Sequence, residues 1–415
     1  MSFWKKKPVA VACPSPSPAA VVEVPEVTPL RGRVSALTEP RLNLLLPSLD
    51  EKHIFGGIAT ALSFFKVLAA DDTELRIILT DQSQAPLLES ASWKDWKILD
   101  GMHEDINGKV IVPMGDRWAR SLAVRSNDRF IATGWWTAYS LLRLLDWQAS
   151  AFAKAKQSFV YLIQDFEPGF YPWSSRYLMA LSTYQDPSPV IRVFNTRLLQ
   201  DYFATYGLPD AQEYAFDPQL NSVLATARQQ LISSEGLLKK EKILLLYGRP
   251  GTPRNGFELA CQGIQHWASQ DSQAADWQCV SVGESHAPIP LGNGRYLSSL
   301  GKLDLTTYAD WLTRSAMGLS LMFSPHPSYP PLEMAAFGMR VITNTYANKD
   351  LSVLSPFIAS LPIVTPESIG TLLMRLSSRY QEGNTSLADD IRPLFASSQN
   401  PFPFMDALRT FWRNT

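Results

Sequence analysis

The 415-residue sequence contains little cysteine and no excess of charge of either sign. Its three cysteines, Cys13, Cys261 and Cys279, are an odd number without CxxC spacing. This usage provides neither a disulfide framework nor a zinc site, and it indicates a reducing compartment. Lys and Arg number 38 against 39 acidic residues, for a net charge of −1. Wrapping of duplex nucleic acid requires a basic surface that releases counterions, so the balanced charge argues against a nucleic-acid partner.

Long hydrophobic runs are also missing. The start of the chain, residues 1–7, lacks the apolar segment of a signal peptide. The longest apolar stretch, residues 130–142, is too short to span a bilayer and contains Gly134 and Thr137. We therefore expect a cytoplasmic protein without a transmembrane segment. The three lysines at residues 5–7 are either part of a flexible tail or a weak peripheral contact with anionic lipid at the inner face of the cell membrane.

Length and composition predict two globular domains. Apolar residues make up 46% of the chain and charged residues 19%, and 415 residues exceed one ordinary core. Residues 1–38 are rich in Pro, Ala and Val, which predicts a disordered tail. We expect a first domain over residues 39–225, a second over residues 226–395, and a terminal helix within residues 396–415 that packs back on the first domain.

Strand-length apolar runs alternate with helical stretches along both halves. This alternation is typical of an α/β fold with parallel sheets covered by helices on both faces, here two consecutive doubly wound, Rossmann-like domains. The expected strands are residues 41–48, 75–80, 109–113, 129–133, 159–164 and 190–195 in the first half, and 242–247, 278–282, 295–300, 317–322 and 340–344 in the second. The expected helices are 58–70, 135–156, 175–183, 256–269, 306–315 and 331–337.

Ligands of such sheets bind at the carboxyl ends of the strands, so residues that follow a predicted strand are the candidates for a site. Gly56 and Gly57 join the first strand to the first helix. Paired glycines allow a close backbone approach, and a helix N-terminus presents free N–H groups to an anion. The alternative is a tight turn required by packing alone.

A polar and aromatic segment follows the strand at residues 159–164. It begins with Gln164 and Asp165, which are the candidate catalytic residues, and continues with Glu167, Tyr171 and Trp173. Polar groups for hydroxyls and aromatic faces for C–H surfaces are the chemistry of a sugar site. The alternative is an aromatic contact between domains, for which two carboxylates are poor choices.

Three cations follow strands of the second half. Arg249 directly follows the strand at 242–247, and Lys302 follows the strand at 295–300. Together they can neutralise a departing diphosphate without metal, and no Asp-x-Asp pair occurs in the sequence. Arg254, on the same loop as Arg249, is either a third such cation or a solvated loop charge.

The segment from Ser324 to Gly338 carries two more candidates. Proline at a first helical position favours a helix start, which places Glu333 in the first turn, where the helix dipole favours a negative charge. A carboxylate there either caps the helix or accepts from ribose hydroxyls. His326 lies on the preceding loop, where a lone histidine is structural or catalytic.

These segments resemble the donor half of retaining GT-B glycosyltransferases of the GT4 type. Four runs, 52–61, 164–173, 247–255 and 324–333, are more specifically similar to bacterial dTDP-rhamnose-dependent rhamnosyltransferases that build S-layer glycans and O-antigens. The resemblance spans about residues 40–355. It implies a GT-B fold in which two Rossmann-like domains face each other across a cleft, with the acceptor in the first domain and the nucleotide sugar in the second.

The resemblance also implies roles for individual residues. Arg249 and Lys302 would contact the diphosphate and Glu333 the ribose, while Gly56 and Gly57 would face the donor. Eight residues before Glu333, where GT4-type enzymes often have a second Glu, this chain has a proline at 325.

Because of this departure, two alternatives remain for the group that holds the donor sugar. One is His326, and the other is Gln164 together with Asp165. The implied activity is metal-independent transfer of L-rhamnose from dTDP-L-rhamnose to a glycan acceptor, lipid-linked or free, with retention and no cofactor. The rival hypotheses are a GT-B sugar-nucleotide epimerase and a non-catalytic sugar-nucleotide-binding scaffold. The sequence says nothing about the oligomeric state.

Overall fold

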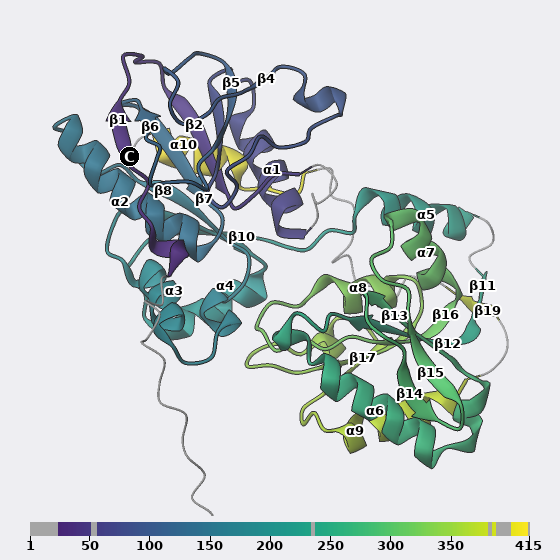
Figure 1. The fold of residues 1–415 in the computed structure, drawn as a ribbon. Helices are drawn as coiled ribbons and strands as arrows, with labels where there is room; N and C mark the ends of the chain where they lie inside the picture. The colour runs from purple at the N-terminus through teal and green to yellow at the C-terminus, as the bar shows by residue number, and fades with distance from the viewer. Residues whose placement is uncertain (1–23, 51–55, 234–236, 381–383, 387–399, 414–415) are drawn as a thin grey trace, which may run out of the picture.

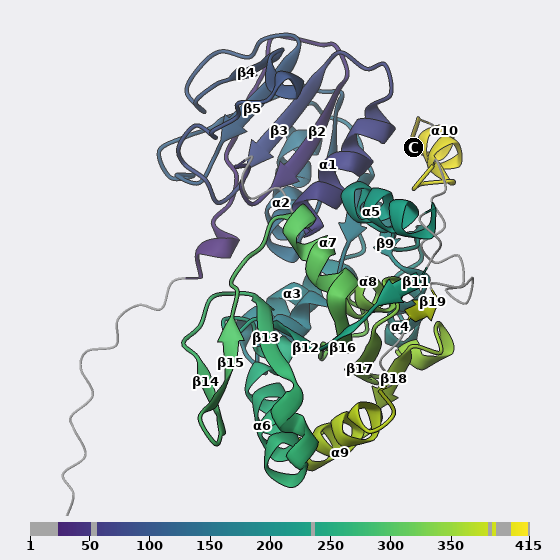
Figure 2. The same ribbon diagram turned by 90° about the vertical axis from the view of Figure 1, so that its right-hand side faces the viewer.

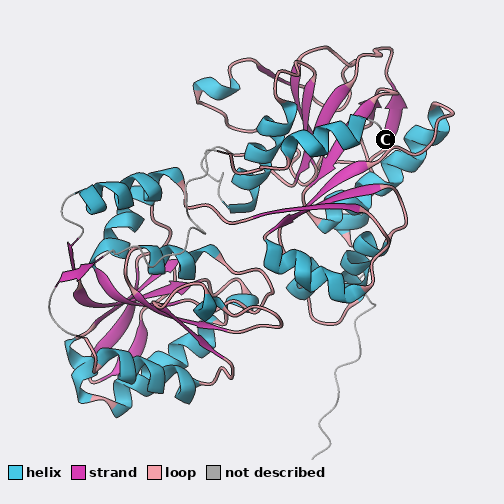
Figure 3. Cartoon of the chain, turned by 180° about the vertical axis from the view of Figure 1, so that it is seen from behind, coloured by secondary structure: helices cyan, strands magenta, loops and turns pink. Residues whose placement is uncertain are grey.

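A computed structural model describes residues 24–50, 56–233, 237–380, 384–386 and 400–413 of the chain. The chain forms two α/β domains, the first coloured purple to teal and the second mostly green in Figure 1. Figure 3 shows the same two domains from behind, each with strands at its centre and helices outside. No helix within the described part of the chain is long and apolar enough to cross a lipid bilayer.

The first domain is built on eight strands that are all parallel to their neighbours. Strands buried on both faces are mostly apolar, and every residue of β2, β3 and β8 is buried, including Arg41, Asn43 and Arg76. In sheet order the strands are β10 (Gln212–Phe216), β9 (Val190–Asn195), β8 (Phe159–Ile163), β7 (Asp128–Ala132), β2 (Arg41–Leu46), β3 (Leu75–Leu79), β5 (Lys109–Pro113) and β4 (Trp96–Ile98). Helices α2 (Trp135–Ala151), α3 (Ser175–Gln185) and α4 (Arg197–Phe203) contribute to the core on one face, and α1 (Gly56–Ala69) on the other.

The second domain contains a seven-stranded sheet, parallel except for the hairpin of β14 and β15. Its order is β14 (Ile289–Gly292), β15 (Arg295–Ser299), β13 (Gln278–Gly283), β12 (Glu241–Gly248), β16 (Ser315–Leu319), β17 (Arg340–Asn344) and β18 (Ile358–Leu361). Helices α6 (Phe257–Gln270) and α9 (Pro366–Ser377) cover one face, and α5 (Ser222–Ser233), α7 (Leu305–Arg314) and α8 (Tyr329–Ala336) the other (Figure 2). A small separate ladder pairs β11 (Leu237–Lys239) with β19 (Asn384–Ser386).

The helix starts follow from local sequence. The Asp304 carboxylate accepts from the N–H groups of Thr306 and Thr307 at the start of α7. Thr365 and Ser368 form a capping box at the start of α9, and Pro366 occupies the first turn. These side chains satisfy N–H groups that the helix itself leaves without an acceptor.

The prediction of a disordered tail over residues 1–38 is wrong for its second half. Residues 1–23 lie outside the described residues, but β1 (Gly32–Val34) pairs in parallel with β6 (Leu122–Val124). Leu30 is buried in the first domain's core, and Glu26 accepts from Arg176 at 2.9 Å. Pairing with β6, which is distant in sequence, provides hydrogen-bond partners for the backbone of a segment whose own composition favours no structure.

The predicted boundary at residue 225 falls inside a helix of the second domain. Helix α5 begins at Ser222, and Leu224 is fully buried with Leu312 of α7. The Arg228 Nε donates to the carbonyl of Ala336 at 2.9 Å. The boundary therefore lies between β10 and Ser222, because the apolar side of α5 packs on the second sheet.

The last helix that the structure describes packs on the first domain. Helix α10 (Met405–Arg413), yellow in Figure 1, lies with the first-domain elements. Its Trp412 donates from Nε1 to the carbonyl of Ser158 at 3.1 Å, and Phe402 meets the ring of Phe64 edge to face at 5.2 Å. Buried side chains of this terminal segment share one core with α1, β2 and β3.

A buried ion cluster joins the amino ends of β2, β3 and β7. Arg41 and Arg76 both donate to Asp128, at 2.8 and 3.2 Å, and the Arg125 Nε donates to Asp105 at 2.9 Å. Although burial opposes ionisation, the neighbouring arginines lower the pKa of Asp105 to about 2. The predicted apolar strand therefore begins on a buried charge, and these carboxylates hold the strand ends together.

Candidate active site

The loops that follow the strands of the two sheets contact each other. Asp165, directly after β8, accepts a hydrogen bond from the Ser324 hydroxyl in the loop after β16. The Arg254 Nε lies 3.6 Å from the other Asp165 oxygen, and its guanidinium lies 4.2 Å from the ring centroid of Phe170. Both the polar residues and an aromatic contact between domains are therefore present at this position.

His326 stands beside this contact with one ring nitrogen unused. Its Nδ1 accepts from the Ser328 N–H at 3.0 Å, so the ring proton lies on Nε2. Among the described residues the buried Nε2 has no hydrogen-bond partner. Burial lowers the pKa of His326 to about 4, which keeps the ring neutral at pH 7. A buried donor without an acceptor costs about 1–3 kcal/mol, so this group is suited to a ligand oxygen.

Lys349 is a further candidate residue that the sequence reasoning missed. It follows β17, its side chain is almost fully buried, and its Nζ donates to the carbonyl of Met322 at 2.6 Å. Burial lowers the pKa of Lys349 to about 7, while Asp165 acts to raise it. The rule that selected Lys302, a cation just beyond a predicted strand, would also have selected this lysine.

The paired glycines meet the loop after β8. Gly56 adopts a left-handed φ of +47° at the start of α1. Gln164 donates from Nε2 to the Gly57 carbonyl at 3.0 Å, and a Cβ on Gly57 would lie 3.3 Å from the Gln164 amide. One glycine therefore serves a turn and the other a close approach, both at the carboxyl edge of the first sheet.

Arg249 is held by a partner that the sequence did not reveal. Its Nε donates to Glu284 at 3.0 Å, and Glu284 also accepts from the Gly251 N–H at 2.7 Å. Lys302 is exposed and follows Gly301, whose carbonyl accepts from the Gly283 N–H at 3.0 Å. The loops after β12, β13 and β15 thus bring Arg249 and Lys302 to one edge of the second sheet. Arg254 lies toward Asp165 instead.

The predicted position of Glu333 in the first helical turn is wrong. Helix α8 begins at Tyr329 and has Pro330 in its first turn, so Glu333 is its fifth residue. The helix dipole acts mainly within the first turn and does not hold this carboxylate ionised. Burial instead raises the pKa of Glu333 to about 7, and the Tyr308 hydroxyl donates to Oε2 at 3.2 Å.

Arg249 and Glu333 act on the same neighbouring side chain. Burial raises the pKa of the Tyr247 phenol, the Arg249 charge lowers it, and the Glu333 charge raises it. Tyr247 lies on β12, one residue before the strand ends. A cation and a carboxyl group with a pKa near neutrality therefore share the carboxyl edge of the second sheet.

Glu167 has a structural role rather than a place among the sugar-site candidates. It is buried, and its Oε2 accepts from the Trp135 N–H at the start of α2 and from the Tyr184 hydroxyl at 3.4 Å. Burial raises the pKa of Glu167 to about 8. Residues 133–137 cap their own helix, because the Thr137 hydroxyl accepts from the Gly134 N–H at 3.0 Å.

We expect the Glu167→Ala variant to lose stability without losing nucleotide affinity. The substitution leaves a buried helix N–H and a buried phenol without an acceptor, at a cost of about 1–3 kcal/mol each. Thermal unfolding should show a lower Tm, and calorimetry should show an unchanged Kd for dTDP, the nucleotide that the resemblance implies. A weaker Kd at unchanged Tm would place Glu167 in the binding site.

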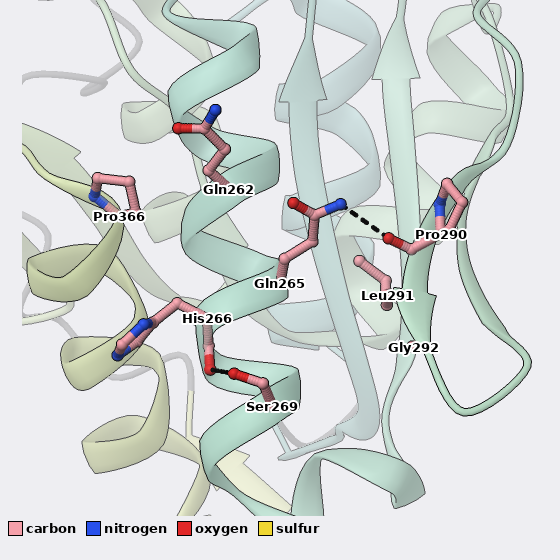
Figure 4. A pocket seen from close by; sticks show the side chains of 8 residues that line it. All are labelled: Gln262, Gln265, His266, Ser269, Pro290, Leu291, Gly292 and Pro366. Atoms are coloured by element: carbon pink, nitrogen blue, oxygen red, sulfur yellow. Dashed lines mark hydrogen bonds between the residues drawn. The ribbon is translucent and has the colours of Figure 1, made fainter. Parts of the chain in front are cut away.

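A surface pocket of the second domain lies apart from these residues. It has a volume of about 540 Å³ and lies between α6, β14 and the start of α9 (Figure 4). None of the candidate residues lines it; its lining residues are Gln262, Gln265, His266, Ser269, Pro290, Leu291, Gly292 and Pro366. Within the residues that the structure describes, no three His, Cys, Asp or Glu side chains are grouped so that they could hold a metal ion.

Comparison with solved structures defines the fold class. A sucrose-phosphate synthase from Thermosynechococcus elongatus matches with a TM-score of 0.55 and 14% identity, over 91% of this chain and 99% of that one. WaaG, a glycosyltransferase involved in lipopolysaccharide biosynthesis, matches with a TM-score of 0.53 and 12% identity, over 90% of this chain and all of that one. The expected GT-B fold of two Rossmann-like domains is confirmed.

Comparison of sequences identifies the family within this class of glycosyltransferases. Residues 41–197 match the WsaF N-terminal domain, and residues 242–374 match the WsaF C-terminal domain. The two matches together span most of the chain in the family's own order, so the chain belongs to the WsaF family of GT-B glycosyltransferases. The O-antigen biosynthesis protein RfbC of Myxococcus xanthus is 29% identical over 217 residues, which are 52% of this chain but only 15% of that protein.

Proposed function

We propose that the chain transfers L-rhamnose from dTDP-L-rhamnose to a growing bacterial surface polysaccharide. The observation that carries this proposal is the shared position of Arg249, Lys302 and Glu333 beyond the carboxyl ends of the second sheet's strands. Two cations suit a diphosphate, and a carboxyl group suits a ribose hydroxyl. The four sequence runs that resemble rhamnosyltransferases supply the identity of the sugar.

In this proposal the second domain holds the nucleotide. Arg249 places its planar fork on the diphosphate and Lys302 adds a second positive charge, so that the charge developing on the leaving group is neutralised by the protein. Glu333 accepts from the 3′-hydroxyl of the deoxyribose. The buried Nε2–H of His326 is then available to a sugar hydroxyl.

The first domain holds the acceptor and closes the site. Asp165 lies at the contact between the domains, and Gln164 lies beside it on the Gly57 carbonyl, so that their polar groups can orient sugar hydroxyls. In a retaining reaction, the acceptor hydroxyl attacks C1 from the side of the leaving group. The bond from C1 to the diphosphate oxygen breaks, a new C1–O bond forms, and the acceptor's proton passes to the departing dTDP. No protein base is required.

The proposed setting is the cytoplasm, at the inner face of the membrane where lipid-linked glycans are accessible. The name of the Myxococcus relative, an O-antigen biosynthesis protein, supports a surface polysaccharide as the product. The neighbour HepE from Anabaena, at a TM-score of 0.53, was solved with UDP and glucose, which supports a nucleotide-sugar donor of some kind.

A single assay separates this function from its rivals. The purified chain is incubated with dTDP-L-rhamnose and a rhamnose-terminated acceptor, and both products are measured. Release of dTDP together with extended acceptor supports the transferase. Conversion of the dTDP-sugar without acceptor would indicate an epimerase. Nucleotide binding with neither product would indicate a scaffold.

We further expect turnover to persist in excess EDTA, because Arg249 and Lys302 provide the positive charge that a metal would otherwise supply. The measurement is the initial rate of product formation with EDTA and after addition of magnesium or manganese. Loss of activity in EDTA with recovery on either metal would contradict metal independence.

A further inference from the structure

A second pocket lies at the opposite end of the first sheet from the candidate site. It has a volume of about 720 Å³ and lies between α10 and the amino ends of β2, β7 and β8. Such a volume is typical of pockets that bind small organic ligands. Parallel strands of five to six residues rise about 3.3 Å per residue, so roughly 15–20 Å separate this pocket from the carboxyl-end loops.

Some of the charges around this pocket are already neutralised within the protein. Arg41 donates to Asp128, and Glu74 accepts from Arg125 at 2.8 Å. Arg409 donates from Nε to the Leu68 carbonyl at 3.2 Å, near the end of α1, where a cation also complements the helix dipole.

Two further arginines give the pocket its positive charge. The guanidinium of Arg129 lies 5.6 Å from the centroid of the Trp412 ring, and Arg413 follows Trp412 in the last turn of α10. Burial and the nearby charge of Arg413 lower the pKa of Arg129, while the exposed Asp72 acts to raise it. Asp72 also lines the pocket and offsets part of this positive charge, and a bound anion would offset the rest.

The remaining lining suits a saccharide rather than a bare anion. Leu42, Leu68 and Trp412 supply apolar surface, and Gln157 and Thr73 supply polar groups. The Gln157 amide donates to the Ser126 carbonyl at 3.0 Å, which fixes the orientation of its side chain. Mixed apolar and polar walls with a few charged groups are the composition of sites that bind sugars and similar ligands.

We propose that this pocket, formed by α10 and the amino ends of the first sheet, binds a saccharide unit that carries a carboxylate or phosphate group. Arg129 and Arg413 hold the anionic group, and the walls contact the sugar ring. The pocket is a binding site only, because it is separate from the residues proposed for transfer. The inference does not depend on the identity of the donor.

The test uses the full chain and four probes: glucose 6-phosphate, glucuronate, glucose and inorganic phosphate. Calorimetry and ligand-observed NMR should show binding of the two acidic sugars, with glucose and phosphate each at least about tenfold weaker. Arg413 is exposed, and the Arg413→Gln variant should weaken both acidic sugars about tenfold while the Kd for dTDP and the Tm stay unchanged. Arg129→Gln should weaken them similarly.

Arg143→Gln is the matched control. Arg143 is an exposed arginine of the same domain that also lies over an aromatic ring, Tyr139, but it does not line the pocket. This variant should bind the acidic sugars like the unmodified chain. Binding of inorganic phosphate as tight as that of glucose 6-phosphate would overturn recognition of the sugar. Absence of acidic-sugar binding, or equal binding by the Arg413→Gln variant, would overturn the site itself.

Discussion

Replacement of Arg249 by alanine should weaken dTDP binding by about 10- to 150-fold. A charge-assisted hydrogen bond contributes about 1.5–3 kcal/mol, and 1.4 kcal/mol corresponds to a factor of ten in Kd. Titration calorimetry with dTDP measures this change directly. The Tm of the unliganded variant should change little, because the Arg249 side chain is 39% exposed and its ion pair with Glu284 lies near solvent.

The ion pair with Glu284 provides a control variant that should change the dTDP affinity in the opposite direction. In the unliganded chain Glu284 competes with the diphosphate for the Arg249 guanidinium. The Glu284→Gln variant removes the competing charge and should bind dTDP several-fold more tightly. Unchanged dTDP affinity in the Arg249→Ala variant would remove Arg249 from the donor site, whatever the control shows.

Replacement of Glu333 by glutamine should weaken dTDP binding by roughly tenfold or more at pH 8, and much less at pH 6. The pKa of Glu333 is raised to about 7 by burial, so the carboxylate forms as the pH rises through 7. Only the ionised group accepts a charge-assisted hydrogen bond from the 3′-hydroxyl, a contribution of about 1.5–3 kcal/mol. The measurement is calorimetry of dTDP binding from pH 6 to pH 8, for the variant and for the unmodified chain. The ratio of the two affinities at each pH cancels the titration of dTDP itself and leaves the effect of Glu333.

The raised pKa of Glu333 also affects the stability of the unliganded protein, which should fall as the pH rises, whereas the contribution of Glu333 to dTDP binding should grow. Because the pKa of Glu333 is higher in the folded chain than its ordinary value of 4.5, the folded state binds the proton more tightly. Its contribution to stability is complete below about pH 4.5 and is lost as the pH rises through 7. At pH 8 the Glu333→Gln variant should therefore melt at the same or a higher temperature. A lower Tm with unchanged dTDP affinity would leave Glu333 a purely structural helix residue.

The sequence predicted the long, buried strands because each is a run made up mainly of apolar residues. It did not predict the three-residue strands β1, β4 and β6, or β10, whose Gln-Glu-Tyr-Ala-Phe sequence is only partly buried at the edge of the sheet. Short edge strands depend on the neighbour with which they pair, and local composition carries no record of that neighbour.

The sequence could propose candidates for the site as far as topology determines their position. Arg249, Lys302, Gln164 and His326 were selected because parallel strands place the loops that follow them at one edge of a sheet. The partners were not found: Glu284 on Arg249 and Ser324 on Asp165 are contacts between loops far apart in sequence. The error at Glu333 arose because Tyr329 and Pro330 already belong to the helix, which moves the carboxyl group out of the first turn.

The return of the chain to the first domain has a consequence for biosynthesis. Phe402, Met405, Leu408 and Trp412 belong to the same core as α1, β2 and β3, yet they are translated after the whole second domain. While the ribosome makes the second domain, the face of the first sheet that awaits α10 is exposed to solvent. We therefore expect the first domain to complete its folding only after residues 400–413 have been translated. A fragment that ends before Ser222 should aggregate unless residues 400–413 are supplied as a separate peptide or fused to it.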